Sequence, residues 1–237
     1  ACRTNSFAIV ICRASITAII RYSLPCVVSQ LQVGINFSTD YNFRTLKNIV
    51  NEPIVVYILE QRNFRETFKV SYTTGLNICF NLTKNVGIET GAQYSKKGYE
   101  NRNALFFEED LLSSNPTPSN GKLAYNFHYL DLPLAANFSF GNRKVRFISS
   151  AGLTTNILMK QTTKFISETE NNVSQTSSQS FNKVNSAPTI SFGIDYKIND
   201  ALNLRVSPTF RYGISKIIDA AITAYLWNAG INVGVYL

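Results

Sequence analysis

The segment YLWNAGINVGVYL, residues 225–237, decides the fold class of this chain of 237 residues. Aromatic and aliphatic side chains occupy every second position from Tyr225 to Leu237, and mostly glycine and asparagine lie between them. Side chains alternate between the two faces of a β-strand. The segment therefore predicts a strand with one apolar face and one face of small or polar residues.

The same alternation recurs upstream and predicts seven further strands. Their apolar faces run through residues 33–43, 68–82, 86–94, 130–140, 145–153, 190–198 and 202–214. These segments match the length of a bilayer-spanning strand, about 9–11 residues, better than the about 5–6 residues of a globular strand. The minority face carries glycine, serine, asparagine, glutamine and charges of both signs, which suits a narrow polar lumen. The apolar face is therefore expected to point outward.

The connections alternate in length. Residues 83–85, 141–143 and 199–201 are short turns, whereas 44–67, 99–121, 158–188 and 215–221 are longer. Short turns on one side and long loops on the other are typical of outer-membrane barrels. We predict an all-β fold: an eight-stranded antiparallel up-and-down transmembrane β-barrel in a bacterial outer membrane, with its turns and termini in the periplasm. An apolar run at 54–59 leaves open a hairpin within 44–67, which would make ten strands.

Residues 1–30 do not share the strand pattern, so the barrel is expected to occupy 31–237. Arg3, Arg13 and Arg21 interrupt two apolar runs in this first segment. A secretory leader has a basic start followed by an apolar run. The sequence leaves two interpretations open for 1–30, a leader-like segment or a periplasmic N-terminal extension.

The composition excludes several classes of protein. With 45% hydrophobic and 16% charged residues, the chain is not a disordered tail. The uncharged stretches 22–39 and 220–237 contain asparagine, serine and glycine, which argues against membrane helices. One histidine and four scattered cysteines predict neither a metal site nor a cofactor. The net charge of +8 comes from lysines and arginines at turns and strand ends. That placement favours lipid head groups and lipopolysaccharide as partners over nucleic acid.

Two residues are weighed as chemical candidates. His128 is the only histidine, and small barrel enzymes that modify lipid combine such a residue with a serine or carboxylate near the rim. Its aromatic neighbours Phe127 and Tyr129 instead favour an interfacial aromatic belt. Cys79 is expected on the outward face of its strand, as a small apolar residue. No catalytic residue is predicted.

The charges on the inner faces form the candidate site. Counted from the short turns, they sort into two layers that each hold both signs. The layer near the turns contains Glu89, Arg146, Asp195, Lys197 and Arg205, and the deeper layer contains Asp40, Asp131 and Arg211. An unpaired buried charge costs several kcal/mol. We therefore expect mutual pairing, a closed lumen rather than a pore, and Arg205 with Asp195 as the leading cross-strand pair.

Five stretches of the chain carry a resemblance to a known group. They are LQVGINFS (31–38), VGIETGAQYSKKGY (86–99), YLDLPLAANFSF (129–140), VRFISSAG (145–152) and FRYGI (210–214). These segments resemble the small PorT-like outer-membrane β-barrel proteins of the Bacteroidetes, and the resemblance covers nearly all of 31–237. It implies a barrel in a Gram-negative cell envelope and, for some members, a part in protein secretion. It implies no catalytic residues. Such barrels usually end on an aromatic residue, whereas this chain ends Val235-Tyr236-Leu237.

The expected function is that of a non-enzymatic structural or interaction component of the envelope. Its long loops would present a surface to protein partners, or dock it into a larger envelope or secretion complex. Two alternatives stay open at this point: a lipid-modifying barrel enzyme that uses His128, and a soluble ligand-binding barrel. The second would leave its outward aromatic side chains in water.

Overall fold

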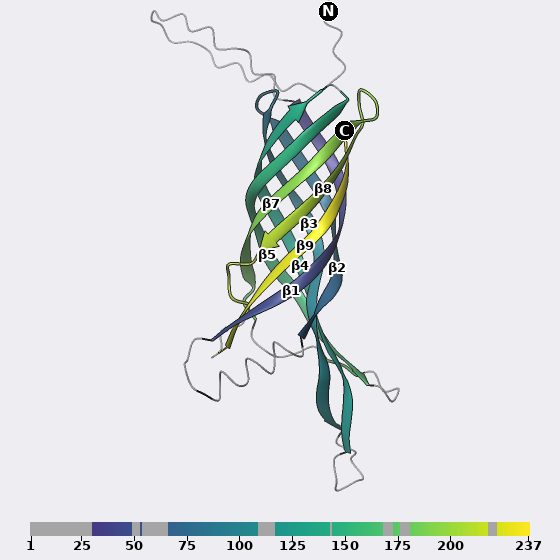
Figure 1. The fold of residues 1–237 in the computed structure, drawn as a ribbon, viewed down its shortest axis with the longest axis vertical. Helices are drawn as coiled ribbons and strands as arrows, with labels where there is room; N and C mark the ends of the chain where they lie inside the picture. The colour runs from purple at the N-terminus through teal and green to yellow at the C-terminus, as the bar shows by residue number, and fades with distance from the viewer. Residues whose placement is uncertain are drawn as a thin grey trace, which may run out of the picture.

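The chain folds into a closed ring of eight long antiparallel strands (Figure 1). The computed structural model describes residues 30–48, 53, 66–108, 117–142, 144–167, 173–175, 181–217 and 222–237. The ring consists of β1 (Gln30–Asn48), β2 (Glu66–Asn81), β3 (Val86–Glu108), β4 (Thr117–Gly141), β5 (Val145–Ser167), β7 (Val184–Lys197), β8 (Asn203–Tyr212) and β9 (Ile222–Tyr236). Each strand pairs with the next one in this series, and β9 pairs with β1. The predicted eight-stranded up-and-down barrel is confirmed.

A ninth strand, β6 (Val173–Gln175), pairs with the far end of β5 and adds nothing to the ring. Residues 44–48, where an extra hairpin was an alternative, continue β1 and pair with β9. Most of the remainder of that segment, 49–52 and 54–65, lies outside the described residues, as do 1–29 of the predicted N-terminal segment. Among the described residues, no helix has the length and apolarity to cross a membrane.

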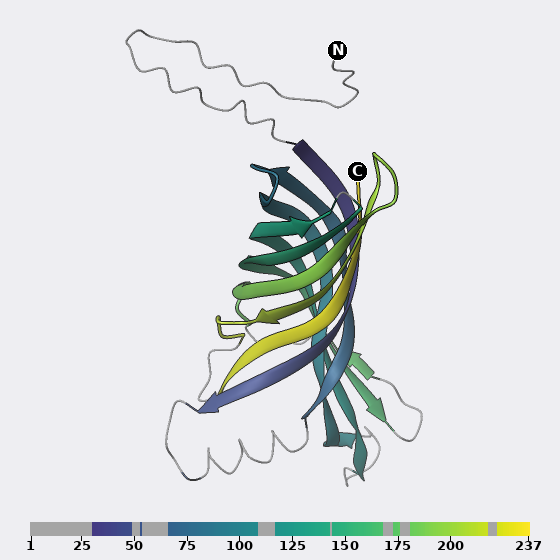
Figure 2. The same cartoon turned by 45° about the horizontal axis from the view of Figure 1, so that its top comes forward.

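The short turns and the end of the chain lie at one end of the barrel, the turn end (Figures 1 and 2). The turns close through backbone hydrogen bonds, for example from Asn142 N to Val145 O at 2.9 Å and from Ile198 N to Leu202 O at 2.9 Å. Gly141 has φ +134°, and a Cβ there would lie 2.6 Å from the carbonyl oxygen of Val145. The opposite end is called the loop end.

Adjacent residues differ sharply in exposure over much of the barrel wall. Ile35 is 64% exposed and Asn36 is 1% exposed, and Phe138 is 51% exposed next to Asn137 at 5%. The barrel thus has an apolar outer surface and a polar interior, the inverse of a water-soluble protein. Large contiguous apolar surface of this kind needs a non-aqueous neighbour. The predicted assignment of the two faces is confirmed at these positions.

Three strands continue well beyond the ring at the loop end. β3, β4 and β5 contain 23, 25 and 23 residues, and the β3–β4 pairing runs as far as Glu108 opposite Thr117. At about 3.3 Å per residue and a tilt of about 40°, 23 residues rise roughly 58 Å, against an apolar band of about 25 Å. The extension is visible below the barrel in Figure 1. The prediction of loops at 99–121 and 158–188 is therefore wrong for most of their described residues. Outside the bilayer, strand pairing continues without the alternation that lipid and lumen impose.

The apolar side chains of β4 change parity near residues 125–129 because Phe127 and Tyr129 are buried together with Asp131 on the inner face. The bulge at this height belongs to the neighbouring strand: His128 lies opposite Lys160 and Tyr129 opposite Leu158, which leaves Met159 of β5 as an extra residue. The lumen itself becomes apolar at this height.

Candidate functional site

The candidate site is the interior of the barrel, and its layer nearest the turn end is organised around Glu89. This carboxylate accepts hydrogen bonds from Asn77 Nδ2 at 2.7 Å, Asn137 Nδ2 at 2.7 Å, Arg205 Nη1 at 2.8 Å and the Tyr236 hydroxyl at 3.2 Å. These donors come from β2, β4, β8 and β9. One carboxylate on β3 therefore ties together strands on opposite sides of the lumen.

Arg205 lies between two carboxylates and over an aromatic ring. Its guanidinium bonds Glu89 at 2.8 Å, lies 3.9 Å from Asp195 Oδ2, and stands 4.0 Å above the Tyr236 ring centroid. Asp195 and Arg205 are direct neighbours in the β7–β8 register. The structure brings the expected pair together, yet the shorter contact of Arg205 reaches across the lumen to Glu89. Charge-assisted contacts of this length are among the stronger hydrogen bonds in proteins.

Two predicted members of this layer lie instead at the rim of the turn end. Arg146 donates to the Ser139 hydroxyl and to the backbone carbonyl of Lys84. Lys197 bonds Asp200 Oδ1 at 2.8 Å, and this hydrogen bond holds the pKa of the exposed Asp200 carboxyl below its usual value. Both residues line an open vestibule of about 620 Å³. They belong to the mouth of the barrel rather than to the cluster around Glu89.

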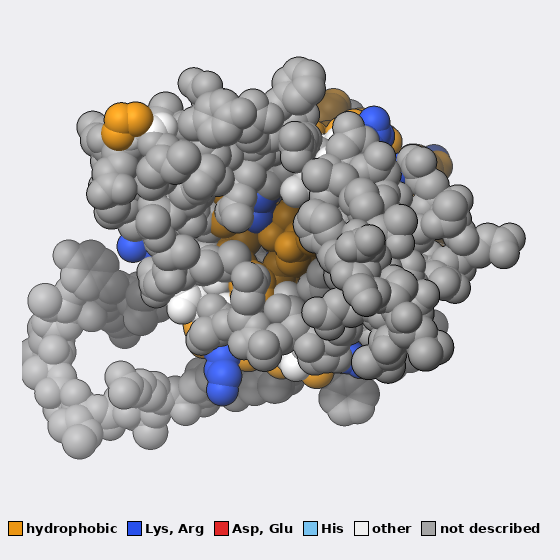
Figure 3. Space-filling model, turned by 90° about the horizontal axis from the view of Figure 1, so that it is seen from below, with side chains coloured by type: hydrophobic (Ala, Val, Ile, Leu, Met, Phe, Trp, Pro, Cys, Tyr) orange, Lys and Arg blue, Asp and Glu red, His pale blue; other side chains and the backbone are white. Residues whose placement is uncertain are grey.

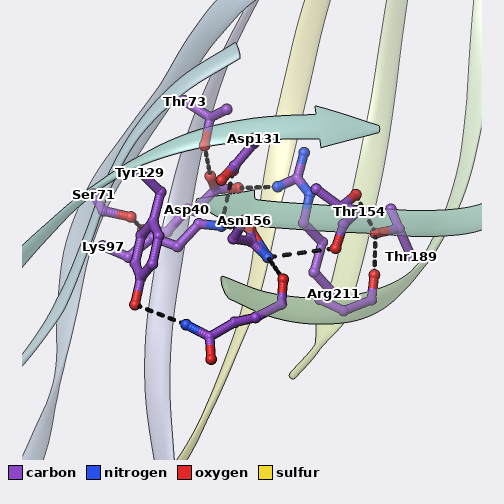
Figure 4. Close-up of polar contacts among 12 residues, drawn as sticks. Asp40, Ser71, Thr73, Lys97, Tyr129, Asp131, Thr154, Asn156, Thr189 and Arg211 are labelled. Atoms are coloured by element: carbon purple, nitrogen blue, oxygen red, sulfur yellow. Dashed lines mark hydrogen bonds and ion pairs between the residues drawn. The ribbon is translucent and has the colours of Figure 1, made fainter. Parts of the chain in front are cut away.

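The deeper layer contains two ion pairs (Figure 4). Asp40 accepts hydrogen bonds from Thr73 and Ser38, each at 2.8 Å, and lies 3.5 Å from Arg211 Nη1. Asp131 pairs with Lys97 Nζ at 2.8 Å.

In both pairs the carboxylate is fully buried and the cation is 5% exposed. Lys97, which also donates to Asn156, was not among the inner charges predicted from the sequence. The missed signal was parity, because Lys97 continues the inner series Gln93 and Ser95.

An aromatic cluster closes the interior on the loop side of these ion pairs. It consists of Tyr99, Phe127, Tyr129, Phe181 and Ile217, all at most 8% exposed. The Phe127 and Phe181 rings meet edge to face at 5.2 Å, and the Arg44 guanidinium lies 3.8 Å from the Tyr99 centroid. Seen from the loop end, apolar side chains lie at the bottom of a hollow (Figure 3). Sequence reasoning placed Phe127 and Tyr129 in an outward belt, and this is wrong.

Little free space remains between the layers. One cavity beside Glu89, Arg205 and Tyr236 measures about 40 Å³, and one beside Lys97 and Tyr129 measures about 20 Å³. Each of these spaces has room for about one water molecule. In the described part of the chain, no group of three or more His, Cys, Asp or Glu side chains could hold a metal ion.

The two chemical candidates from the sequence lie apart from each other. His128 is on the outer face, where its Nδ1 contacts the Tyr94 hydroxyl. Cys79 is 1% exposed and contacts Asn81 and Asn137 in the lumen. The expectation that Cys79 faces outward is wrong. Its odd number places it with Asn77 on the inner face of β2, whose outward residues are even.

Comparison with known proteins gives one family match. The family model described as "Outer membrane protein beta-barrel domain" matches residues 21–219. No curated protein matches the chain.

Several solved structures are similar to the chain. Neisserial surface protein A has 10% identity, 87% of this chain and 96% of that chain covered, and a TM-score of 0.44. OprG from Pseudomonas aeruginosa has 12% identity, 87% and 95% coverage, and a TM-score of 0.44. The outer membrane protease OmpT from Escherichia coli has 7% identity, 89% and 96% coverage, and a TM-score of 0.46. Likeness at this level carries no information on activity.

Proposed function

The chain belongs to the outer membrane β-barrel protein family and lies in a bacterial outer membrane, and from this premise we propose that it is a non-enzymatic barrel with a closed lumen. Its role would be that of a structural or interaction component of the envelope, joined to partners at the loop end. The turns and termini would lie in the periplasm and the β3–β5 extension outside the cell. Residues 1–30 would form a leader-like or periplasmic segment before the barrel at 31–237. The affinity with the PorT-like proteins of the Bacteroidetes is part of this proposal.

The pairing of inner charges is the observation that carries the closed lumen. An eight-stranded barrel has an interior just wide enough for side chains to fill it. Here Arg205 spans to Glu89 near the turn end, and Lys97 and Arg211 each meet a buried carboxylate deeper inside. An ion would have to separate these pairs and then pass the cluster around Phe127. The interior thus supports a plug made of two polar layers and one apolar layer.

The β3–β5 extension supports an interaction role. Protein partners reach an outer-membrane barrel most easily through what projects beyond the lipid, and here two paired hairpin arms project well beyond it. A shortened variant tests this role: Asn101 and Leu123, which are paired, would be joined by an Asn-Gly turn. The shortened barrel should still insert and resist denaturation. It should lose partners that the wild-type barrel retains on purification from native membranes at low detergent.

Planar-bilayer recording tests the closed lumen. The wild-type barrel should show no steady ohmic conductance, and steady conductance would refute the proposal. The double variant Arg205→Ala/Phe127→Ala removes one constriction from each half of the interior and should show leak currents. Phe138→Ala/Leu134→Ala truncates two outward side chains and serves as the matched control, which should stay silent.

The second candidate function is a lipid-modifying enzyme. The observation that favours it is the position of His128 on the outer face, next to lipid. Its described hydrogen-bond partner is Tyr94, not the serine or carboxylate that such chemistry would use. Lipid A from cells that express wild-type protein or the His128→Ala variant distinguishes the two functions. Identical lipid A is expected from a non-enzymatic barrel, and a modification that disappears with His128 would replace the proposal.

A further inference from the structure

A row of polar and basic side chains crosses four adjacent strands on the outer face. The register places Tyr72 of β2 opposite Lys96 of β3, Lys96 opposite His128 of β4, and His128 opposite Lys160 of β5. Tyr72 and Lys160 are exposed and the middle two are partly exposed. The bulge at Met159 brings Lys160 level with His128. We call Tyr72, Lys96, His128 and Lys160 the outer row.

On β4 the outer row lies where the apolar surface ends. On the turn-end side of His128, Leu132 and Leu134 are 39% and 60% exposed, whereas on its loop-end side Lys122 is exposed. On β2 the apolar surface continues past Tyr72 to Val70 and Phe68. Tyr94 adjoins the row on its turn-end side, with its ring centroid 6.2 Å from that of Tyr72 and 5.9 Å from that of His128. Amphipathic aromatic rings collect at the height of lipid head groups. This places His128, with Tyr94 beside it, at the boundary between the apolar surface and the charged residues of the loop end.

The cations of the outer row have no described counter-charge. Two other described cations of β2 and β3 meet carboxylates: Lys97 meets Asp131, and Lys69 meets Glu100 at 3.5 Å. Lys96 and Lys160 form no ion pair with a described carboxylate. Both lysines lie directly opposite His128 in the strand register, so the three basic groups form one patch. In the tautomer in which the Tyr94 hydroxyl donates to Nδ1, the neutral His128 ring carries its proton on Nε2 and presents a further donor.

We propose that the outer row binds the phosphate group of a glycolipid in the outer leaflet. Lys96 and Lys160 lie on the two strands that flank His128, about 10 Å apart across the sheet, and their flexible stems can converge on one phosphate. A membrane lipid is the occupant rather than free phosphate, because the row is continuous with the apolar surface around Leu132 and Leu134, where acyl chains lie. The inference rests on the outer-membrane location in the proposed function but not on the closed lumen.

Native mass spectrometry of the full chain from nanodiscs tests the site. The nanodiscs contain phosphatidylcholine with a minor fraction of bisphosphorylated lipid A, and the readout is the fraction of barrel that retains lipid A. Each lysine near an anionic head group is worth roughly a fivefold change in binding, so Lys96→Gln/Lys160→Gln should weaken retention roughly 30-fold. The matched control Lys84→Gln/Lys144→Gln removes the same charge from exposed residues at the turn end and should retain lipid A as the wild type does.

Each outcome decides the inference. Retention lost only in Lys96→Gln/Lys160→Gln supports the site, whereas equal loss in both variants, or none in either, overturns it. Two further arms use the wild type: dephosphorylated lipid A should not be retained, and millimolar inorganic phosphate should not displace lipid A. Retention of the dephosphorylated lipid, or full displacement by phosphate, refutes a lipid-phosphate site. Conductance tests the lumen separately, so the two ideas fail independently.

Discussion

Arg205 is the residue at which the interior is most sensitive to a single change. It is 7% exposed and shared by Glu89 and Asp195, so Arg205→Ala leaves two carboxylates without their cation. Glu89 keeps three neutral donors, but Asp195 Oδ1 has no described partner and Oδ2 loses its nearest cation among the described ion pairs. The loss of stability therefore comes mainly from the two negative charges of Glu89 and Asp195, which no longer have a cation between them.

The magnitude follows from breaking a buried pair on one side, which costs about 3–5 kcal/mol. The neutral donors to Glu89 and the water in the adjacent vestibule of about 620 Å³ reduce this. We expect Arg205→Ala to lower the free energy of unfolding by about 3 kcal/mol, near the lower end of that range. Arg205→Lys keeps a charge but loses the planar fork over Tyr236 and should cost about 1 kcal/mol.

Urea unfolding in lipid vesicles measures these changes. Trp227 is the only tryptophan and is stacked on Phe43 at 4.2 Å, so its fluorescence reports folding. Arg146→Ala is the matched control, because Arg146 bonds a hydroxyl and a backbone carbonyl at the rim. It should lower the free energy of unfolding by at most about 1 kcal/mol. Equal losses for Arg205→Ala and Arg146→Ala would refute the reasoning. So would strict additivity of Glu89→Gln and Arg205→Met, since paired charges should couple by about 1–3 kcal/mol.

Three further outcomes are expected. Phe138→Arg, on the outer surface, should lower the free energy of unfolding by about 2–4 kcal/mol. Phe140→Arg, nearer the turn, should lower it by less, because the cost of a charge falls toward the membrane interface. Equal losses for the two variants in vesicle unfolding would contradict this placement. Gly141→Ala should cost about 1–3 kcal/mol, since φ +134° is strained for residues with a Cβ, while Ala151→Gly on the outer face of β5 should show no comparable loss in the same assay. A membrane-impermeant maleimide on intact cells should label Arg102→Cys above the unsubstituted background, and label Lys84→Cys only after the outer membrane is permeabilised; the reverse pattern would invert the topology.

The sequence alone determined which residues face lipid and which face the interior over most of the barrel. The reason is local: a strand places successive side chains on opposite faces, so the parity of Phe138 and Asn137 assigns both. The same rule correctly predicted an inner position for six charged residues: Asp40, Glu89, Asp131, Asp195, Arg205 and Arg211. It would also have found Lys97 and placed Cys79 correctly, had parity been followed through each strand.

Only the tertiary structure decided which inner residues meet. Glu89 and Arg205 are 116 positions apart and lie on β3 and β8, so their contact depends on the ring being closed and narrow. The height of each residue along the barrel also depends on strand tilt and, beyond Met159, on the bulge in β5. Arg146 and Lys197 lie at the rim, which a count of residues from the turns did not predict. The apolar interior around Phe127 escaped the pattern because an apolar residue can face lipid or a closed lumen. Parity assigns a face, but only closure of the barrel decides what that face encloses.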